Sequence, residues 1–488
     1  MTKNILFVYP LNEGGCLGIE YLSSVLKKGG YKVDLILDLK TENDFKKRLY
    51  KRIKSFEPDF VCFSVMTDNY LWACDIARAV NEMTDALIIF GGIQVTSCPE
   101  EVLGNDFVDY IIIGEGEGAI KEIVDDKVID KLCIPNVWVK LGDDIIKNPV
   151  RPLIRDLDSL PYPDKEIFIK EAPHFQEVYR CLTSRGCPFG CSYCFNSYMK
   201  NLYKGDKWLR QRSVKNVIDE LELIKKRGTY KQIFFVDDSL TSNREWLIEF
   251  LKEYKEKIDI PFKAMSHPLF IDDEVARLLK KAGCLRIQIG AQTPNEKIRS
   301  EICKRHEKNE TILKAVNHLK DHKIMVNIDH IFDLPTETLE DYEEGLKFYI
   351  DLKPQKYTSF WLQYFPNTEI VDIGRTHGGI DEEALKLTRK GNISYSTNSG
   401  TKKETHKELM AISRFMNWIP LLPKSVSRYI LKKKWHFKIF KYKIWDKLYR
   451  VPYFIIHLFP LKNVKILFLV MKRKKIIKDT IKKANKEK

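Results

Sequence analysis

Three cysteines in one short stretch are the residues with the clearest chemical role in this sequence. Cys187, Cys191 and Cys194 follow a C-x₃-C-x₂-C spacing within a single loop. Three thiolates can hold three irons of a four-iron cluster, and because four cysteines are the usual complete set, the fourth iron is left open to a small molecule. The alternatives are three unrelated reduced cysteines, or a zinc site with a second pair of Cys or His ligands. No such pair follows within the next 70 residues.

This loop resembles that of the radical S-adenosylmethionine (SAM) superfamily, whose spacing is C-x₃-C-x-aromatic-C, with Tyr193 at the aromatic position. The resemblance implies a [4Fe-4S] cluster held by the three cysteines and SAM bound at the open iron. It also implies reductive cleavage of SAM to a 5′-deoxyadenosyl radical that attacks an unactivated carbon. The spacing is far more specific than a lone C-x-x-C pair.

The length and the cysteine content limit the classes of protein to which this chain can belong. A chain of 488 residues is long for one core and predicts two or three domains. The 11 cysteines are odd in number and only three cluster, so they do not form a disulfide framework. The N-terminus enters an apolar segment without the pattern of a signal peptide. We expect a cytoplasmic, anaerobic protein, with an electron donor such as flavodoxin or ferredoxin.

Most of the positive charge lies in the last part of the chain. Residues 401–488 carry 25 Lys/Arg and 5 Asp/Glu, so the first 400 residues carry a net charge of −5 out of the chain's total of +15. This tail alternates cations with apolar and aromatic residues, which fits peripheral contact of 400–488 with an anionic membrane. A small helical cap with a solvated basic face is an equally good interpretation. No RNA-binding motif occurs, so nucleic acid is a weak candidate.

Alternating strands and helices predict a doubly wound parallel sheet over residues 1–130. Ligands of such sheets bind at the carboxyl ends of the strands. Glycines gather at those ends, where they let the backbone approach a ligand, although ordinary tight turns explain any single pair. The expected strands are Asn4–Tyr9, Lys32–Leu37, Phe60–Val65, Leu87–Phe90 and Tyr110–Ile113.

This region resembles the Rossmann-like cobalamin (B12)-binding domain that precedes many radical SAM enzymes, through Ser64 and the pair Gly91-Gly92. Glu13 and Gly15 stand where that family places the Asp and the axial His, so an imidazole ligand is missing. Bound cobalamin without that ligand, and a retained fold that binds substrate or nothing, both stay open. The resemblance implies a cobalamin site at Ser64, Thr67, Gly91, Gly92, Gln94, Glu115, Gly116 and Glu117.

A proline-rich connector over 131–175 precedes a second strand–helix alternation over 176–375, and the basic amphipathic region follows at 376–488. Six strand–helix units predict a partial (βα)₆ TIM barrel, with its chemistry at the carboxyl ends of the strands. The cysteine loop follows the first of these strands, where such a site belongs. The expected strands are Glu177–Thr183, Gln232–Val236, Phe262–Met265, Leu285–Ile289, Met325–Ile331 and Tyr357–Tyr364.

Polar residues at the ends of later strands are candidates for SAM binding. Asp237 and Asp238 end the second strand, where carboxylates could receive the amino group of SAM or form a turn with a helix N-cap. Gln292 lies in a segment that resembles the family's Gly-x-Gln/Glu-Ser element. The turn after the fifth strand resembles Gly-Leu-Pro-Gly-Glu-Thr, with Asp333 and Thr336 in place of glycines. The SAM candidates are therefore Tyr193, Asp237, Asp238 and Gln292.

The resemblances together imply a cobalamin-type radical SAM enzyme that most simply methylates a carbon of a small-molecule or lipid-linked substrate. Two alternatives remain: cyclisation or rearrangement without methyl transfer, and a non-catalytic iron–sulfur or cobalamin-binding protein. The residues do not identify the substrate or a catalytic side chain beyond the cofactor sites.

Overall fold

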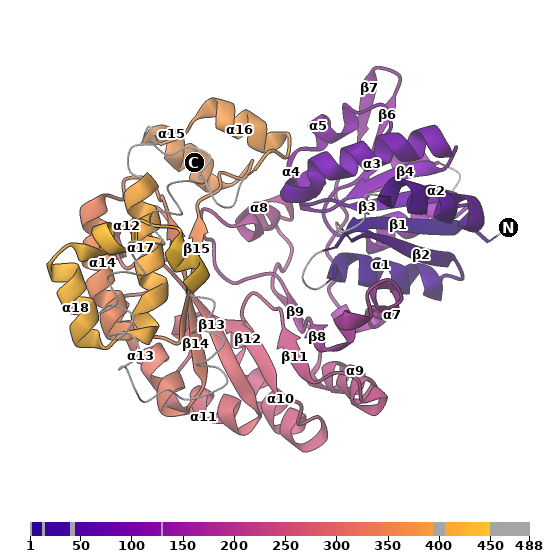
Figure 1. Cartoon of the computed structure of the whole chain (residues 1–488). Helices are drawn as coiled ribbons and strands as arrows, with labels where there is room; N and C mark the ends of the chain where they lie inside the picture. The colour runs from indigo at the N-terminus through magenta and orange to yellow at the C-terminus, as the bar shows by residue number, and fades with distance from the viewer. Residues whose placement is uncertain are drawn as a thin grey trace. The chain divides into compact units, whose positions relative to one another are not determined.

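The computed structural model describes residues 2–11, 15–39, 44–127, 130–377, 379–393 and 406–448. The chain divides into two compact units, residues 1–409 and 410–488. The first unit contains both predicted sheets, and Figure 1 shows their strands and helices.

The first sheet has seven strands in the order β2-β1-β3-β4-β5-β6-β7. Strands β1 to β5 are parallel, as predicted, and form because short runs of apolar residues are buried on both faces by helices. The strands are β1 (Asn4–Pro10), β2 (Lys32–Asp38), β3 (Phe60–Ser64), β4 (Leu87–Gly91), β5 (Tyr110–Ile112), β6 (Val137–Leu141) and β7 (Asp144–Lys147).

Helices cross between these strands in the manner of a doubly wound fold. They are α1 (Leu17–Lys28), α2 (Phe45–Phe56), α3 (Tyr70–Met83), α4 (Ile93–Ser97), α5 (Pro99–Leu103) and α6 (Glu117–Val124). A short 3-10 turn, η1 (Thr67–Asn69), precedes α3.

The predicted connector differs from the structure at its start. Strands β6 and β7 form an antiparallel hairpin that extends the first sheet, so this sheet continues to residue 147 instead of ending near 130. The hairpin was missed because Gly142 turns a segment with little apolar alternation. The rest of the connector contains α7 (Glu166–Ile169) and short 3-10 turns.

The second sheet has six parallel strands in the order β15-β14-β13-β12-β11-β8, which confirms the partial barrel. The strands are β8 (Val178–Cys181), β11 (Gln232–Phe235), β12 (Phe262–Ser266), β13 (Cys284–Gln292), β14 (Met325–Phe332) and β15 (Lys356–Trp361). A separate two-stranded ribbon joins β9 (Ser184–Arg185) and β10 (Arg210–Gln211).

Helices pack on one face of this second sheet, and α8 follows the cysteine loop. Their apolar stripes recur at helical spacing, and several begin with a side-chain cap, as Ser213 does for α9. The helices are α8 (Phe195–Leu202), α9 (Val214–Arg227), α10 (Arg244–Lys257), α11 (Asp273–Lys281), α12 (Glu296–Glu301), α13 (Asn309–Asp321), α14 (Leu339–Leu352), α15 (Glu369–Thr376) and α16 (Glu382–Arg389).

The C-terminal region begins with α17 (His406–Trp418), which is followed by α18 (Lys424–Lys432) and α19 (Trp435–Ile439). Within the second unit, the rings of Trp418, Phe440 and Trp445 lie 4.9–6.3 Å apart in pairs. No helix of the described residues is long and apolar enough to cross a bilayer. The aromatic and basic runs 449–461 and 466–471, on which the membrane prediction chiefly depends, lie outside the described residues.

Candidate functional site

The cysteine loop connects the β9 strand to helix α8 and is anchored at several points. The backbone N–H of Cys194 donates to the carbonyl of Cys191 over 3.1 Å, and the Ser197 hydroxyl donates to the same carbonyl over 2.7 Å. Ser192 is fully buried, and its N–H and hydroxyl donate to the carbonyls of Cys303 and Ile302. These bonds anchor the part of the loop that runs from Cys191 to Cys194.

The three thiols form one electrostatic group. Burial raises the pKa of Cys187 to about 12 and that of Cys194 to about 11, and the neighbouring cysteines add to both shifts. Thiols in this state become ligands only when a metal displaces their protons. Among the described residues, no three His, Cys, Asp or Glu side chains are close enough to bind one metal ion. A four-iron cluster puts each thiolate on a different iron, so three cysteines can hold three of its irons.

Asp237 shapes the segment that leads into the loop. Its Oδ1 accepts hydrogen bonds from the Thr183 N–H (3.0 Å), the Thr183 hydroxyl (2.8 Å) and the Ser184 hydroxyl (2.6 Å). The residue is fully buried, and its Oδ2 has no partner among the described residues. The structure therefore uses one oxygen of this SAM candidate to position the strand before the cysteines.

Asp238, the second carboxylate at this strand end, lies nearer the cysteines. Surrounding protein raises its pKa to about 6, although an interaction with Asn196 opposes the rise and the residue still reaches solvent. Its charge in turn raises the pKa of Cys187 and Cys194, which places it beside the cluster loop. Of the two carboxylates, Asp238 is therefore the one that is open to a ligand.

Gln292 and Tyr193 come together with an arginine that the sequence analysis missed. A Cβ on Gly290 would lie 2.2 Å from the Gln292 Nε2, so the amide folds over this glycine. Arg305 donates to the Gly290 carbonyl over 2.8 Å. Burial raises the pKa of Cys191 and that of Tyr193, and the charge of Arg305 opposes both shifts. A buried guanidinium at this point can hold an anionic group such as a carboxylate.

The Arg305 side chain is held in place by a second charged residue. Glu307 accepts from Arg305 over 2.7–2.8 Å and lies 3.6 Å from His267. The His267 ring stacks on Phe189 of the cysteine loop at 3.9 Å between ring centroids. Burial lowers the pKa of His267 to about 2, so this ring is neutral and serves as packing for the loop. A charged residue in a loop has no distinctive sequence signal, which is why Arg305 was missed.

The turn after β14 keeps a shape normally reserved for glycine. Asp333 has φ 74° and Thr336 has φ 68°, at the two positions where the resembled motif has glycines. The Asp333 N–H donates to the Tyr342 hydroxyl over 2.7 Å, which helps to hold the strained conformation. The substitutions therefore leave the left-handed backbone of the turn in place.

Glu337 in this turn is expected to make the protein less stable at high pH. Burial raises its pKa to about 8, against hydrogen bonds from Thr293 and Tyr342. In the unfolded chain Glu337 has its ordinary pKa of 4.5 and is ionised above that pH, whereas in the folded protein it keeps its proton up to about pH 8. The free energy of unfolding therefore falls as the pH rises from 4.5 to 8. We expect Glu337→Gln to raise Tm above that of the wild type at pH 8.5, by roughly 2 °C or more, and little at pH 5.

Thermal unfolding at the two pH values measures this difference. Glu340→Gln is the control, because Glu340 is an exposed carboxylate in the same segment. An equal change of Tm at both pH values in the Glu337 variant would contradict the prediction.

The candidate cobalamin residues lie at the carboxyl ends of β3, β4 and β5, which are neighbours in the sheet. Gly92 has φ 105°, and a Cβ there would lie 2.7 Å from the Val65 carbonyl oxygen. A Cβ on Gly91 would meet nothing nearer than 3.9 Å, so the end of β4 presents bare backbone. This open, side-chain-free edge fits a large flat ligand such as a corrinoid.

No histidine from this domain can bind cobalt, because the first histidine in the chain is His174. Glu13, one of the two residues at the axial motif, lies outside the described residues. Gly15 is described and carries no side chain. The Cys16 thiol lies 3.5 Å from the Ser64 hydroxyl, next to this edge. A corrinoid bound here would have no imidazole from the first domain.

We expect Gly92→Ala to abolish corrinoid binding. The added Cβ would push apart the ends of β3 and β4, and the alanine would also take a φ of 105°. Gly142→Ala is a matched control, because Gly142 has φ 62° and no atom within 4 Å of its Cβ position. Corrinoid absorbance per protein after purification from cobalamin-fed cells measures the effect. Equal corrinoid content in the two variants would contradict the assignment of this edge.

Other candidates on the same edge make contacts within the protein. Gln94 is buried, and its amide donates to the Arg389 carbonyl over 2.6 Å. Thr67 is also buried, in the 3-10 turn after β3. Gly116 is the N-cap of helix α6. Gln94 and Thr67 are therefore buried within the protein, whereas Ser64, Gly91 and Gly92 are only partly buried.

Glu115 and Glu117 form ion pairs with the barrel. Glu115 accepts two hydrogen bonds from Arg210, at 2.7 and 3.0 Å, and lies 3.2 Å from Arg185. Glu117 pairs with Arg185 at 2.6 Å. We refer to these four side chains as the interdomain clamp. Arg185 lies two residues before Cys187, so the clamp ties the candidate cobalamin edge to the cluster loop.

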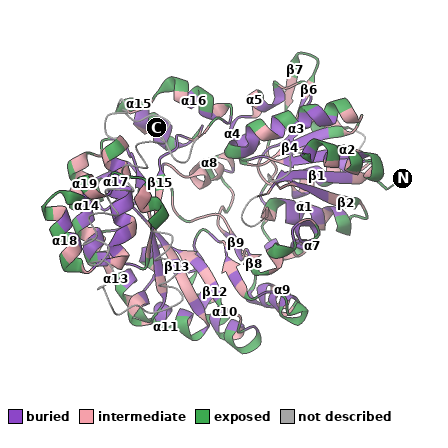
Figure 2. Ribbon diagram, viewed as in Figure 1, coloured by how far each residue is buried: buried purple, intermediate pink, exposed green. Residues whose placement is uncertain are grey.

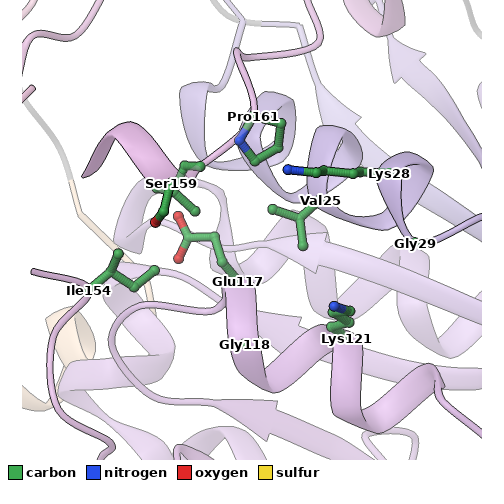
Figure 3. A pocket seen from close by; sticks show the side chains of 10 residues that line it. Val25, Lys28, Gly29, Glu117, Gly118, Lys121, Ile154, Ser159 and Pro161 are labelled. Carbon is green, nitrogen blue, oxygen red and sulfur yellow. The ribbon is translucent and has the colours of Figure 1, made fainter. Parts of the chain in front are cut away.

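A pocket of about 360 Å³ lies beside the clamp. Figure 3 shows the Glu117 side chain in it between Ile154 and Ser159, with Lys121 on the same helix. Helices α1 and α6 and the connector line this pocket, and Glu117 is its only contribution from the candidate site residues. We therefore do not place the reaction there.

Two family models match the two sheets. A model of the radical SAM superfamily matches residues 181–349, and a model of the B12 binding domain matches residues 5–124. The first match covers the cysteine loop and strands β11 to β14, and the second covers the glycine-rich edge at β3 to β5.

Relatives match most of the chain. An uncharacterised methyltransferase of Pyrococcus horikoshii is 30% identical over 438 residues, which cover 81% of this chain and 92% of the relative. An anaerobic magnesium-protoporphyrin IX monomethyl ester cyclase of Rubrivivax gelatinosus is 27% identical over 74% of this chain and 68% of its own. The solved structure of the radical SAM methyltransferase TsrM from Kitasatospora setae has a similar fold, with a TM-score of 0.65 and 18% identity over 78% of this chain and 77% of its own.

Proposed function

We propose that this protein, a member of the radical SAM superfamily with a B12 binding domain, methylates an unactivated carbon of its substrate. As an enzyme of this kind it uses a [4Fe-4S] cluster, SAM and cobalamin. The observation that carries the proposal is the clamp, which ties the glycine-rich edge of the first domain to the segment before Cys187. Methylation requires that both cofactors act on the same carbon. Ion pairs that hold the glycine-rich edge next to the cluster loop meet this requirement.

The residues of the chain have separate roles in this proposal. Cys187, Cys191 and Cys194 hold the cluster, and the bare backbone at Gly91 and Gly92 receives cobalamin. When bound, the cluster supplies the electron that cleaves SAM, and cobalamin supplies the carrier for the methyl group. An electron donor such as flavodoxin or ferredoxin would deliver that electron.

Around the open iron, the side chains orient SAM. Arg305 presents a buried positive charge to the carboxylate of SAM, and Asp238, ionised above about pH 6, presents a negative charge to its amino group. Gln292 offers both a donor and an acceptor. Asp237 acts through Thr183 and Ser184 by positioning the loop, and is therefore a positioning residue.

The products derived from SAM test the proposal. Methylation consumes one SAM as methyl donor, leaving S-adenosylhomocysteine, and a second as radical source, leaving methionine and 5′-deoxyadenosine. We expect an extract of the source cells, supplied to the reduced enzyme with [methyl-²H₃]SAM, to yield a small molecule heavier by the labelled methyl group. Labelled product in equal amount without cobalamin would contradict the proposal.

A second candidate is cyclisation or rearrangement without methyl transfer, because a relative of 27% identity is a cyclase. This reaction would form 5′-deoxyadenosine and a changed product without S-adenosylhomocysteine. The same experiment therefore separates the two candidates by the presence of the label in the product.

A further inference from the structure

The second unit exposes a pair of aromatic side chains on helices α18 and α19. The structure describes all eight tryptophans of the chain, and Trp435 is the only exposed one among them, at 39%. Its ring packs edge to face against that of Tyr429, which is 51% exposed, with 5.5 Å between the ring centroids. Single apolar side chains are common on protein surfaces, but two large rings in contact keep a continuous apolar area in water. This pair therefore points to a partner that covers it.

The exposed pair lies outside the core of its own unit. Ile430 follows Tyr429 and is buried, and His436 follows Trp435 and is fully buried. Phe440 is also buried, and its N–H donates to the His436 carbonyl over 3.0 Å. Figure 2 shows exposed residues in green along helix α18. The inner side of the two helices thus has its own buried residues, and the aromatic pair lies on the outer side.

Three exposed lysines flank the aromatic pair. Lys432 and Lys433 lie one helical turn after Tyr429, and the Lys433 N–H donates to the Tyr429 carbonyl over 3.0 Å. Lys438 lies one turn after Trp435 in α19. None of the three lysines forms an ion pair with another described residue. We refer to these five side chains as the aromatic–basic patch.

The second unit has almost no acidic residue that could balance the patch. Residues 410–448 carry ten Lys/Arg and one Asp/Glu, which is Asp446. Asp446 lies 3.0 Å from the buried Arg414, so it is already paired. Residues 449–488, which lie outside the described residues, carry 12 Lys/Arg and two Asp/Glu. That segment has the same sign of charge as the patch, so Coulomb repulsion disfavours it as the partner that covers the patch.

A membrane surface with anionic lipids has the chemistry that would cover this patch. Trp and Tyr are enriched at the headgroup level of membranes, because each ring has an apolar body and a polar end. Lysines are attracted by the negative surface potential, and their long side chains reach the headgroups. Nucleic acid fits less well, because two rings at an interplanar angle of 87° cannot both stack on successive bases of one strand.

We propose that the aromatic–basic patch attaches this enzyme to the surface of an anionic membrane. Tyr429 and Trp435 would enter the headgroup region, and the three lysines would contact anionic lipids. The proposal goes beyond the methylation reaction and does not depend on it. It assigns the membrane contact that the sequence suggests for residues 400–488 to described side chains of α18 and α19.

Flotation with lipid vesicles tests the lysines of the patch. Full-length protein is mixed with vesicles of phosphatidylcholine and phosphatidylglycerol, or of phosphatidylcholine alone, and the bound fraction is measured after centrifugation. We expect binding to the anionic vesicles only, and weaker binding as salt is added. The double variant Lys432→Gln/Lys433→Gln is expected to lower the partition coefficient about 25-fold, because each lysine near an anionic membrane contributes a factor of about five.

The double variant Lys226→Gln/Lys252→Gln is the matched control for net charge. Lys226 and Lys252 are exposed lysines of α9 and α10, and neither forms an ion pair with a described residue. Their replacement removes the same charge from the first unit. We expect this control to bind the anionic vesicles like the wild type.

The Trp435→Ala variant tests the aromatic pair. We expect it to bind the anionic vesicles about fivefold less tightly, because the area of a large ring is no longer buried. The ratio between wild type and variant should persist as salt is added, since salt screens charges and not apolar burial. Tyr50→Ala is the control, because Tyr50 of α2 is an exposed aromatic residue of the first unit. Thermal unfolding verifies that each variant is folded.

No binding of the wild type to anionic vesicles would overturn the proposal, as would an equal loss of binding in the patch variants and their controls. A single-stranded oligouridylate that binds the wild type but not the patch variants, without any vesicle binding, would assign the patch to nucleic acid and overturn it as well. The patch variants are expected to cleave SAM like the wild type. A failure of this proposal is therefore distinguishable from a failure of the proposed reaction.

Discussion

Replacing Cys191 with alanine is expected to remove the cluster and reduce SAM cleavage to the background of the assay. Cys191 is 8% exposed. In the proposed ligand set it is one of three thiolates that would each hold a different iron. Its loss would leave two irons without protein ligands. Iron and sulfide content after anaerobic reconstitution, together with 5′-deoxyadenosine formation from SAM, measure the two effects.

Cys303→Ala is the matched control for this experiment. Cys303 is fully buried, and its carbonyl accepts from the Ser192 N–H in the cluster loop, but its thiol lies outside the C-x₃-C-x₂-C motif. We expect this variant to keep four irons and to cleave SAM. A Cys191→Ala protein with an intact cluster, or a Cys303→Ala protein without one, would show that the ligand set is misassigned.

Arg210→Met is expected to destabilise the protein and to uncouple the two domains. The Arg210 side chain is 2% exposed and holds both oxygens of Glu115. Removing one partner of a buried ion pair leaves an uncompensated charge and costs about 3–5 kcal/mol. Arg185 remains beside Glu115 but is shared with Glu117. Denaturant unfolding of Arg210→Met and of the wild type measures the loss of stability. Proteolysis of the connector near residues 150–165 is expected to become faster in the variant.

Arg244→Met is the control, because Arg244 is about half exposed and pairs with Asp272 and Glu274 on the surface. Exposed pairs contribute about 0–1 kcal/mol, so this variant should unfold like the wild type. An equal effect of the two substitutions would refute the clamp as a stabilising contact.

The ion pair between Glu115 and Arg210 also predicts that the stability of the protein depends on pH in the acid range. Burial alone would raise the pKa of Glu115, but hydrogen bonds from Arg210 and the charge of Arg185 hold it below its ordinary value of 4.5. A depressed pKa stabilises the fold above pH 4.5, and this contribution is lost as the pH falls through the folded-state pKa.

Much of the fold follows from the pattern of apolar runs. The strand runs of both sheets and the cysteine loop after the first barrel strand are local features, and strands such as β2 (Lys32–Asp38) lie within one residue of their predicted bounds. The β6–β7 hairpin was not predicted, because apolar and polar residues alternate only weakly along its short strands. The sixth barrel strand ends at Trp361 rather than Tyr364, since the segment after it turns at Pro366 and Asn367.

The site was predicted less completely, because side chains at a strand end can face either a ligand or the protein. Asp237 looks like a ligand in the sequence, yet its oxygen is used by Thr183 and Ser184. Glu115 and Glu117 lie at the expected edge and bind arginines of the other sheet. The arginines that pair with Glu115 and Glu117 are distant in the sequence, so no local sequence pattern predicts them. Arg305 is found only when the structure brings it to Gly290 and Cys191.

The dependence of SAM-derived products on cobalamin tests the central claim most directly. Full-length protein, reconstituted anaerobically with iron and sulfide, is reduced in the presence of SAM and a cell extract, with and without cobalamin, and the products are measured by mass spectrometry. We predict 5′-deoxyadenosine in both reactions, and S-adenosylhomocysteine together with a methylated product only in the reaction with cobalamin. No 5′-deoxyadenosine in either reaction, or S-adenosylhomocysteine in equal amounts in both, would contradict a cobalamin-dependent radical methyltransferase.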